Sequence, residues 1–499
     1  MIEVGNLMVK KEYVLHIVDK LKCGIKSEIK KKNYEAALEL ILNCANILYQ
    51  TNLYYVDEDL EGYLKEIANK MEILSPIGKK TDVIFFYDGF GLNSRGLAQI
   101  YIKALCQIKK VIYITYEDRK ENIPDIQNII NKNDGRILYI NRSQKKYTEQ
   151  ILQLCSFASE FKPHDFFFYS FPNDVVGVTS LNIFEGKVTR YQINLTDHAF
   201  WLGARCIDKC IEFRDYGANV SVKYRGISKN IIVKLPFYPI INKDISFQGF
   251  PFQIVNGQKV VFSGGALYKT FGGENKYYDI IDNILKKYKE VVFWYAGSGD
   301  DSKLKELMKK YPGRIFHTLE RNDLFQTLQH CRFYLNTYPI CGGLMYQYAA
   351  LAGIVPVTLR HDEDADGYLL NQEKLVVDFE NKADLYQEVD KLIRDDTYFY
   401  ERRNQLRCSV VSEEEFMCNL KEIMNNNDIM EINYTDINTD VFRSEYLNRI
   451  SQYDIDSFLI SKKTIKTILK YFPMHVLRGI IKKLISKCKS LLKKYNVKQ

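Results

Sequence analysis

The sequence contains no run of 18 or more apolar residues, so we expect no transmembrane helix. Its N-terminal stretch, MIEVGNLMVKKEYVLHIVDK, carries charges early and lacks a continuous apolar segment, so we expect no secretory signal peptide. The eleven cysteines are scattered and none forms a CxxC pair. This usage is typical of reduced thiols in a cytoplasmic protein, and it argues against the alternatives of a disulfide framework or a zinc site.

Signals for nucleotide loops, lipid anchors and metal ions are also missing. The glycine-rich segments match neither a Walker A loop nor GxGxxG. Ile2 stands where N-myristoylation requires glycine, and the C-terminal NVKQ lacks a prenylation cysteine. The acidic HDEDADG, residues 361–367, alternates aspartates but lacks the glutamate that completes an EF-hand. We interpret it as a solvated or acceptor-side loop and expect no metal site.

Charge is distributed unevenly along the chain. Residues 462–499 contain twelve lysines and arginines and no acidic residue. Removing these charges from the net +8 leaves about −4 for residues 1–461, so the body lacks the basic character of a nucleic-acid-binding protein. The tail has the pattern of a basic amphipathic helix. We expect it to lie on an anionic membrane; a solvated helix docked on the body is the alternative.

Short apolar strands alternate with helices in two separate stretches, which predicts an α/β fold with two Rossmann-like parallel sheets. Between them lies a proline-rich stretch with little periodicity. The first residues are helical and form a small cap, although KKNYEAALELILNCANILYQ resembles one tetratricopeptide unit. The predicted segments are a helical segment (1–78), a first Rossmann-like domain (79–235), a linker (236–258), a second Rossmann-like domain (259–425) and a helical basic tail (426–499).

Three glycine loops follow predicted strands of the second sheet, in VVFSGGALYKT, YAGSGDD and LNTYPICGG. Ligands of parallel sheets bind at the carboxyl ends of the strands. Backbone N–H groups and one lysine suit a diphosphate, whereas tight packing corners are the other explanation. The candidate phosphate-binding residues are Gly264, Gly265, Lys269, Gly297, Gly342 and Gly343.

In the first domain, TDHAFWLG lies at a predicted strand end. Transfer of a group to a hydroxyl needs a base that takes the hydroxyl proton, and a histidine beside a carboxylate suits this role. We therefore predict His198 and Asp197 as catalytic residues. The alternative is an aspartate helix cap next to a structural histidine.

The segments GALYKT and RIFHTLERNDLFQTLQHCRFYLNTYPICGG…ALAGIVPVTL resemble the catalytic C-terminal domain of the O-GlcNAc transferase family and its bacterial protein glucosyltransferase relatives. More loosely, INLTDHAFWLGARCIDKCIEFRDYG resembles the segment that closes the first half of that catalytic region. The resemblance implies a GT-B fold with two domains facing a cleft, in which 79–235 is the acceptor domain and 259–425 the nucleotide-sugar domain. It implies that Lys269 contacts the donor diphosphate without a metal ion. It also implies that the segment beginning RIFHT binds the nucleotide. We therefore assign Arg321, Thr337 and Gln347 of this segment to the donor.

Departures from the family pattern concern the nucleoside. Leu344 and Met345 replace a threonine pair, and Tyr348 replaces the acidic residue that contacts the ribose. Ala266 replaces a glutamine before the lysine loop. A UDP-sugar is the expected donor, and a donor with a different base is the alternative.

We expect a metal-independent hexosyltransferase that moves sugar from a nucleotide-sugar to a glycan or lipid-linked acceptor. The basic tail favours bacterial capsule or O-antigen synthesis at the cytoplasmic membrane face. Three alternatives remain open: a non-catalytic partner subunit, a protein O- or N-glycosyltransferase, and a sugar-nucleotide epimerase.

Overall fold

The computed structural model of the chain describes residues 2–71, 81–93, 96–242, 244–360, 375, 377–427, 430–448, 452–459, 464–481 and 484–485. The chain divides into two compact units. Unit 1 comprises Met1–Lys234 and Leu420–Gln499, and unit 2 comprises Leu235–Asn419. Unit 1 is therefore built from both ends of the sequence, with unit 2 inserted between them.

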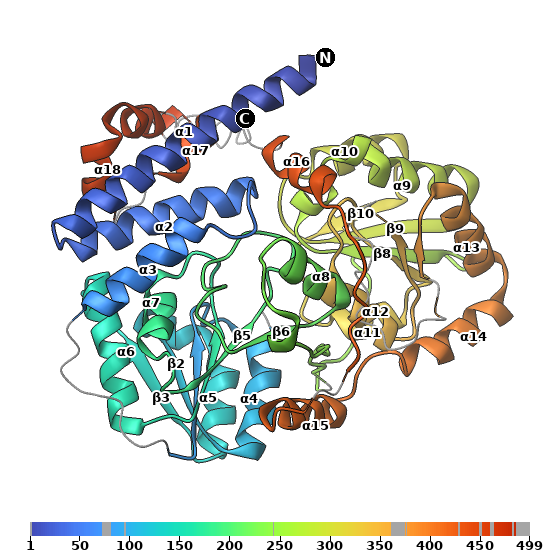
Figure 1. Cartoon of the computed structure of the whole chain (residues 1–499). Helices are drawn as coiled ribbons and strands as arrows, with labels where there is room; N and C mark the ends of the chain where they lie inside the picture. The colour runs from blue at the N-terminus through green and yellow to red at the C-terminus, as the bar shows by residue number, and fades with distance from the viewer. Residues whose placement is uncertain are drawn as a thin grey trace. The chain divides into compact units, whose positions relative to one another are not determined.

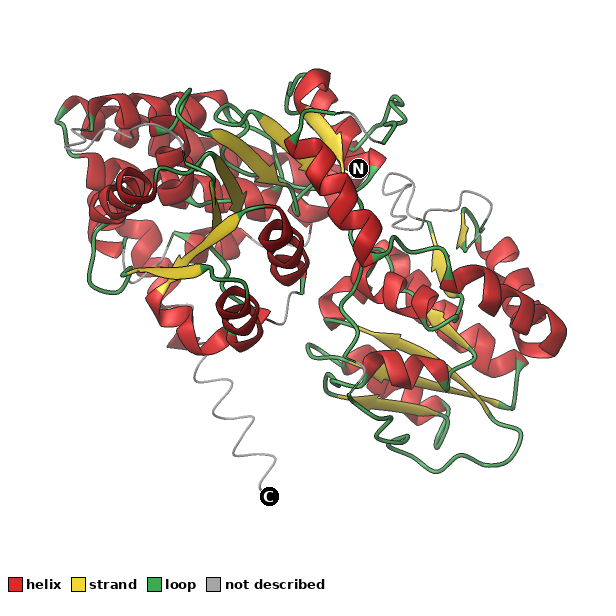
Figure 2. Ribbon diagram, turned by 90° about the horizontal axis from the view of Figure 1, so that it is seen from below, coloured by secondary structure: helices red, strands yellow, loops and turns green. Residues whose placement is uncertain are grey.

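A seven-stranded parallel sheet forms the centre of unit 1 (Figure 1). Its strand order is β3-β2-β1-β4-β5-β6-β7. Helices flank the strands (Figure 2), which explains why the strands read as continuous apolar runs. The strands are β1 (Val83–Asp88), β2 (Lys110–Tyr116), β3 (Arg136–Ile140), β4 (Asp165–Tyr169), β5 (Thr189–Ile193), β6 (Lys209–Glu212) and β7 (Ile232–Lys234). The helices between them are α4 (Leu97–Ile108), α5 (Pro124–Lys132), α6 (Tyr147–Phe161), α7 (Val175–Ile183) and α8 (Asp215–Lys223).

Three helices precede this sheet: α1 (Ile2–Lys30), α2 (Tyr34–Thr51) and α3 (Glu58–Lys70). The side chains of Asn33 and Asp57 cap the first turns of α2 and α3 by accepting backbone N–H groups. Apolar residues of the three helices belong to the same hydrophobic core as residues of the sheet. The helical segment is therefore an integral layer of unit 1.

The C-terminal helices return to the N-terminal ones. They are α16 (Asp440–Asn448), α17 (Gln452–Phe458) and α18 (Ile465–Tyr471), and each contacts α1 or α2. Tyr13 of α1 donates a hydrogen bond to Asp456 over 2.8 Å, and His475 Nδ1 lies 2.7 Å from the same carboxylate. These contacts join the two ends of the chain.

Unit 2 contains a six-stranded parallel sheet with the order β10-β9-β8-β11-β12-β13. The predicted α/β architecture with two parallel sheets is confirmed. The strands are β8 (Lys259–Gly264), β9 (Val291–Ala296), β10 (Ile315–Thr318), β11 (Phe333–Leu335), β12 (Pro356–Leu359) and β13 (Asp378–Phe379). The helices are α9 (Lys276–Lys287), α10 (Ser302–Lys310), α11 (Leu324–Gln329), α12 (Gly343–Leu351), α13 (Lys382–Arg394), α14 (Asp396–Arg407) and α15 (Glu413–Met424), which continues into unit 1.

The connection between the sheets belongs to unit 2. The described residues of 235–258 form neither helix nor strand. Phe250 and Phe252 place their rings 6.0 and 5.9 Å from the ring of Trp294, so the segment packs on the unit 2 sheet. Among the helices that the structure describes, none combines the length and apolarity needed to cross a bilayer.

Candidate functional site

The glycine loops of unit 2 meet at one edge of its sheet. β8 lies between β9 and β11, and all three run parallel, so their following loops emerge side by side. Gly265 donates its N–H to the Ala296 carbonyl over 3.0 Å and has a φ of +122°, which favours glycine. A Cβ on Gly297 would lie 1.9 Å from the Gly265 carbonyl oxygen. Close packing of two loops thus explains the glycine at 297 without a ligand.

Lys269 lies on a short 3₁₀ turn, η4 (Leu267–Thr270), in the loop after β8. Its carbonyl accepts a hydrogen bond from Ile340 N over 3.3 Å, which brings this loop against the one after β11. The side chain is half-buried, and burial lowers the pKa of its ammonium group. Within the described part of the chain, the ammonium group has no acidic partner. A desolvated cation at this edge favours an anionic ligand.

The loop after β11 is organised by Asn336. Its Oδ1 accepts the N–H groups of Thr337 over 2.9 Å and Gly342 over 3.0 Å. Thr337 donates its hydroxyl to the Ile340 carbonyl over 2.6 Å. Gly342 and Gly343 then begin α12. The Thr337 side chain therefore shapes the turn, while the first turn of α12 retains backbone donors for an anion.

Two other predicted donor residues form contacts within the fold. Arg321 lies 2.7 Å from Asp323 through Nε and stacks its guanidinium 5.0 Å from the ring of Trp294. Gln347 is buried and donates its amide to the Phe237 carbonyl of the connecting segment. These two side chains thus bond to Asp323 and to the Phe237 carbonyl.

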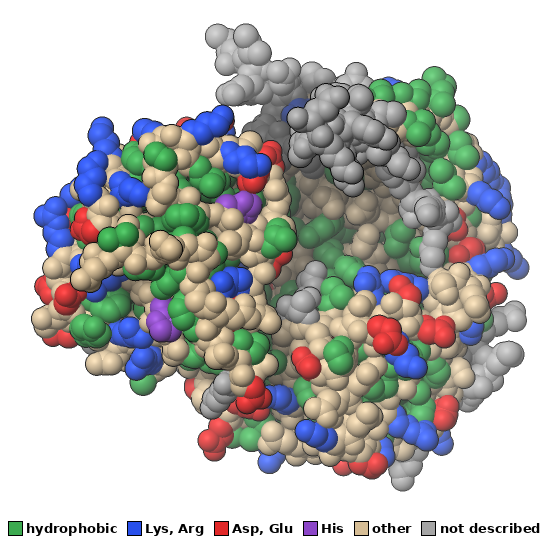
Figure 3. All heavy atoms as spheres, turned by 180° about the vertical axis from the view of Figure 1, so that it is seen from behind, with side chains coloured by type: hydrophobic (Ala, Val, Ile, Leu, Met, Phe, Trp, Pro, Cys, Tyr) green, Lys and Arg blue, Asp and Glu red, His purple; other side chains and the backbone are tan. Residues whose placement is uncertain are grey.

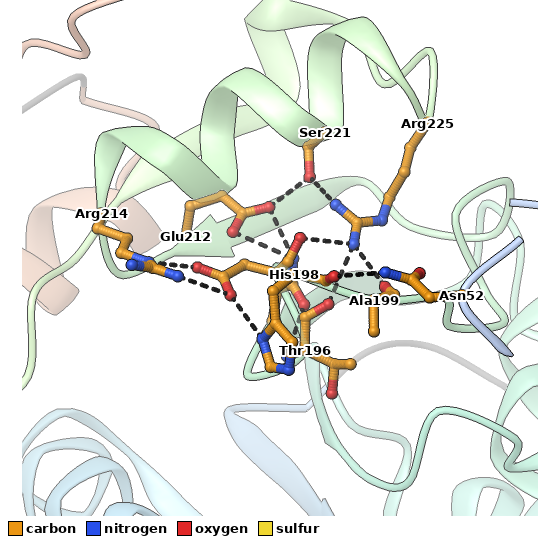
Figure 4. A network of polar contacts seen from close by, with 10 residues as sticks. Asn52, Thr196, His198, Ala199, Glu212, Arg214, Ser221 and Arg225 are labelled. Carbon is orange, nitrogen blue, oxygen red and sulfur yellow. Dashed lines mark hydrogen bonds and ion pairs between the residues drawn. The ribbon is translucent and has the colours of Figure 1, made fainter. Parts of the chain in front are cut away.

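In unit 1, Asp197 and His198 follow β5, at the carboxyl edge of the sheet. Figure 4 shows His198 among its polar neighbours. Asp197 is 1% exposed, and its carboxylate lies 2.5 Å from Nε and 3.2 Å from Nη2 of Arg214. His198 Nδ1 lies 3.1 Å from the same carboxylate. The predicted pair is thus extended by an arginine, which comes from the loop after β6.

Electrostatics determine which nitrogen of His198 is available. Burial alone would raise the pKa of Asp197, but the charge of Arg214 and hydrogen bonds from His198 and Arg214 outweigh it and hold the pKa below its usual range. The ionised carboxylate favours the tautomer that carries its proton on Nδ1. The Nε2 lone pair of the half-exposed His198 is then free to accept a proton.

The sequence did not single out several residues around this pair. Arg225 is fully buried and donates to backbone carbonyls next to His198, and Asn52 of the helical segment donates to the carbonyl of His198 itself. Phe442 and Tyr446 of α16 place their rings 6.2 and 6.4 Å from the His198 ring. Of these residues, only Arg214 had a local signal in the sequence: it is the arginine of CIEFRDYG, shortly after a predicted strand end.

Two buried carboxyl groups near this edge have a pKa raised to about 7 by burial: Glu61 and Glu212. Glu61 accepts the N–H of Gly203 over 2.8 Å. A carboxyl whose pKa is raised in the folded state binds its proton more tightly there than in the unfolded chain. Its contribution to stability is therefore complete below about pH 4.5 and is lost as the pH rises to about 7.

We predict that Glu61→Gln removes part of this pH dependence. The amide oxygen still accepts the Gly203 N–H, but no charge forms on raising the pH. Relative to wild type, the variant should gain about 3 kcal/mol of unfolding free energy between pH 5 and pH 8, at about 1.4 kcal/mol per pKa unit. Urea unfolding at both pH values measures this difference, with the exposed Glu160→Gln as control. A constant difference between Glu61→Gln and wild type would contradict the prediction.

Neither site is assigned a metal. Among the described residues, no group of three or more His, Cys, Asp or Glu side chains is arranged to hold a metal ion. The acidic segment 361–367, interpreted above as a solvated or acceptor-side loop, lies outside the described residues.

No known protein-family model matches the chain, and no curated protein matches it in sequence. Several solved structures are similar to the chain. An O-GlcNAc transferase variant of Thermobaculum terrenum has a TM-score of 0.53 and 14% identity over 87% of this chain and 83% of that chain. WaaG, a glycosyltransferase involved in lipopolysaccharide biosynthesis, has a TM-score of 0.47 and 13% identity over 69% of this chain and all of its own. A UDP-N-acetylglucosamine 2-epimerase has a TM-score of 0.46 and 11% identity over 72% of this chain and all of its own. The first of these similarities, together with the two parallel sheets, identifies the fold as that of the GT-B glycosyltransferases.

Proposed function

We propose that the chain is a glycosyltransferase that uses a nucleotide-sugar donor. The observation that carries this proposal is Lys269, a half-buried cation without an acidic partner among the described residues. Its loop is hydrogen-bonded to the loop that leads into α12. A diphosphate supplies the negative charge that this edge of unit 2 lacks. We assign the donor to unit 2 and the acceptor to unit 1.

The proposed reaction transfers the sugar in one displacement at its anomeric carbon. The acceptor oxygen forms a bond to that carbon, and the bond to the diphosphate oxygen breaks with its electron pair staying on the leaving group. His198 Nε2 takes the acceptor proton, and Asp197 stabilises the resulting imidazolium. Lys269 and the N-terminal amides of α12 balance the charge of the departing diphosphate.

We further propose a UDP-sugar donor and a glycan or lipid-linked acceptor in bacterial capsule or O-antigen synthesis, at the cytoplasmic face of the membrane. The C-terminal end of unit 1 supports the membrane part of this proposal. Helical residues at 473–481 and 484–485 expose apolar side chains, most of them spaced three or four residues apart. Figure 3 shows hydrophobic side chains gathered beside Lys and Arg over this region. The exposed stripe consists of Met474, Leu477, Ile481, Leu484 and Ile485.

A membrane role predicts that charge on the stripe weakens vesicle binding. Leu477 is 51% and Ile481 47% exposed, so replacing both with glutamate removes apolar surface without disturbing the core. In sedimentation with vesicles of equal parts phosphatidylglycerol and phosphatidylcholine, we expect about tenfold weaker binding. Leu152→Glu, at an exposed leucine of α6, is the control. Equal sedimentation of the double variant and wild type would refute the membrane proposal.

A non-catalytic partner subunit is the second candidate, and it is favoured by one observation. The side chains of Arg321, Thr337 and Gln347 bond to the protein itself, and Tyr348, which replaces the family's acidic residue, donates its hydroxyl to the Ile240 carbonyl over 2.7 Å. Side chains that already hydrogen-bond within the protein have fewer donors and acceptors available to bind a nucleoside.

A donor screen separates these functions. The chain is incubated with UDP-, GDP-, CMP- and dTDP-sugars, and binding by calorimetry and nucleotide release by mass spectrometry are measured. Release of the nucleotide that depends on an acceptor supports glycosyl transfer. Interconversion of the donor sugar without an acceptor identifies an epimerase instead. Absence of binding to every donor supports the partner subunit.

A further inference from the structure

The turn that carries the proposed base is held by a buried arginine. Arg225 is fully buried, and its Nη2 lies 3.0, 2.9 and 2.7 Å from the carbonyl oxygens of Thr196, Asp197 and Ala199 (Figure 4). One nitrogen thus donates hydrogen bonds to three carbonyl groups of a single tight turn. The turn is curved around the guanidinium, so its shape depends on where that group lies.

The one carbonyl of this turn that Arg225 does not contact is bound from the helical segment. Asn52 Nδ2 donates to the His198 carbonyl over 2.9 Å. Asn52 is the C-cap of α2 and has the left-handed conformation, with a φ of 48°, which asparagine tolerates better than most residues. Two side chains from distant parts of the sequence therefore bind four consecutive carbonyls.

Arg225 itself has little freedom to move. Its guanidinium lies 5.1 Å from the ring of Tyr55 and 5.2 Å from the ring of Trp201, and its Nη1 lies 3.2 Å from Ser221 Oγ. Ser221 in turn donates to the buried carboxyl of Glu212 over 2.5 Å. A planar group stacked against two rings keeps a fixed direction for its hydrogen bonds.

We propose that Asn52 and Arg225 are positioning residues, which hold the Thr196–Ala199 turn so that His198 keeps one orientation toward the acceptor. This inference rests on the proposed function, because it takes His198 as the group that receives the acceptor proton. It assigns a catalytic purpose to the N-terminal helical segment, which supplies Asn52. A base displaced by about 1 Å loses about 100-fold in rate.

Asn52→Gly provides the sharper test, because glycine retains the left-handed backbone and removes only the amide. We expect kcat for nucleotide release from the donor found in the screen to fall about tenfold, with KM for that donor unchanged. The His198 imidazole resonance, assigned from the spectrum of His198→Gln, should shift. Asn426→Gly is the matched control, since Asn426 also ends a helical segment with a φ of 63°. It should leave both readouts as in wild type.

Arg225→Lys keeps the charge but not the fork of donors, and we expect about 100-fold lower kcat with the same shift of the His198 resonance. Unchanged kcat and an unmoved resonance in Asn52→Gly would overturn the inference, as would a lower melting temperature alone. If neither wild type nor variant turns over any donor, the proposed function fails. A shifted His198 resonance in Asn52→Gly would then still support the positioning of the turn.

Discussion

Lys269→Ala lowers kcat/KM for nucleotide release by about 100- to 1,000-fold, since removing one charged group from a leaving-group site costs several kcal/mol of transition-state stabilisation. The ammonium group is half-buried, and no acidic residue of the described chain neutralises it. A diphosphate in this place gains a charge-assisted contact in a partly desolvated setting. Titration calorimetry with UDP should show weaker binding by the variant as well.

The matched control is Lys286→Ala, which removes an exposed lysine from α9 of the same unit. It should bind donor and turn over as wild type does. Near-normal turnover by Lys269→Ala would remove the assignment of the diphosphate to this edge of unit 2. The glycines at 264, 265, 342 and 343 would then be explained by loop packing alone.

His198→Gln should lower kcat by about 100- to 10,000-fold, the range that loss of a general base produces. Donor binding should be unchanged, because the proposed mechanism assigns His198 to the acceptor and not to the donor. The amide of glutamine remains within reach of Asp197 but does not accept a proton near neutral pH.

His164 supplies the control for this experiment. It lies 3.0 Å from the carboxylate of the adjacent Asp165, but at the amino end of β4, opposite the edge that carries His198. His164→Gln therefore removes a histidine that lies at a similar distance from an adjacent aspartate in the same sheet. Equal losses of activity in both variants would indicate a general effect on folding and contradict the role of His198 as the base.

The fold was predictable because parallel strands buried on both faces leave an apolar record in the sequence. DFFFY and VVFWYA read as strands without reference to any partner, and both are strands, β4 and β9. The place of the glycine loops followed from the same rule. Their cause did not, since only coordinates reveal that Gly297 lies against the Gly265 carbonyl.

The surroundings of His198 were beyond sequence reasoning for a different reason. The hydrogen bond from Asn52 to His198 joins residues 146 positions apart, and such a contact produces no periodic pattern. Arg225 could not be recognised either, because the sequence does not distinguish a buried arginine from an exposed one. Only its neighbours, Tyr55 and Trp201, distinguish it.

The return of the chain to unit 1 has a consequence for synthesis on the ribosome. Residues 420–448, which bring Phe442 and Tyr446 beside His198, are translated only after the whole of unit 2. Because domains fold as they emerge, unit 2 is complete while the first unit still waits for its last piece. The nascent polypeptide thus holds the His198 turn before it holds the two rings of α16 that lie beside the imidazole, and unit 1 gains these rings only after unit 2 has been translated.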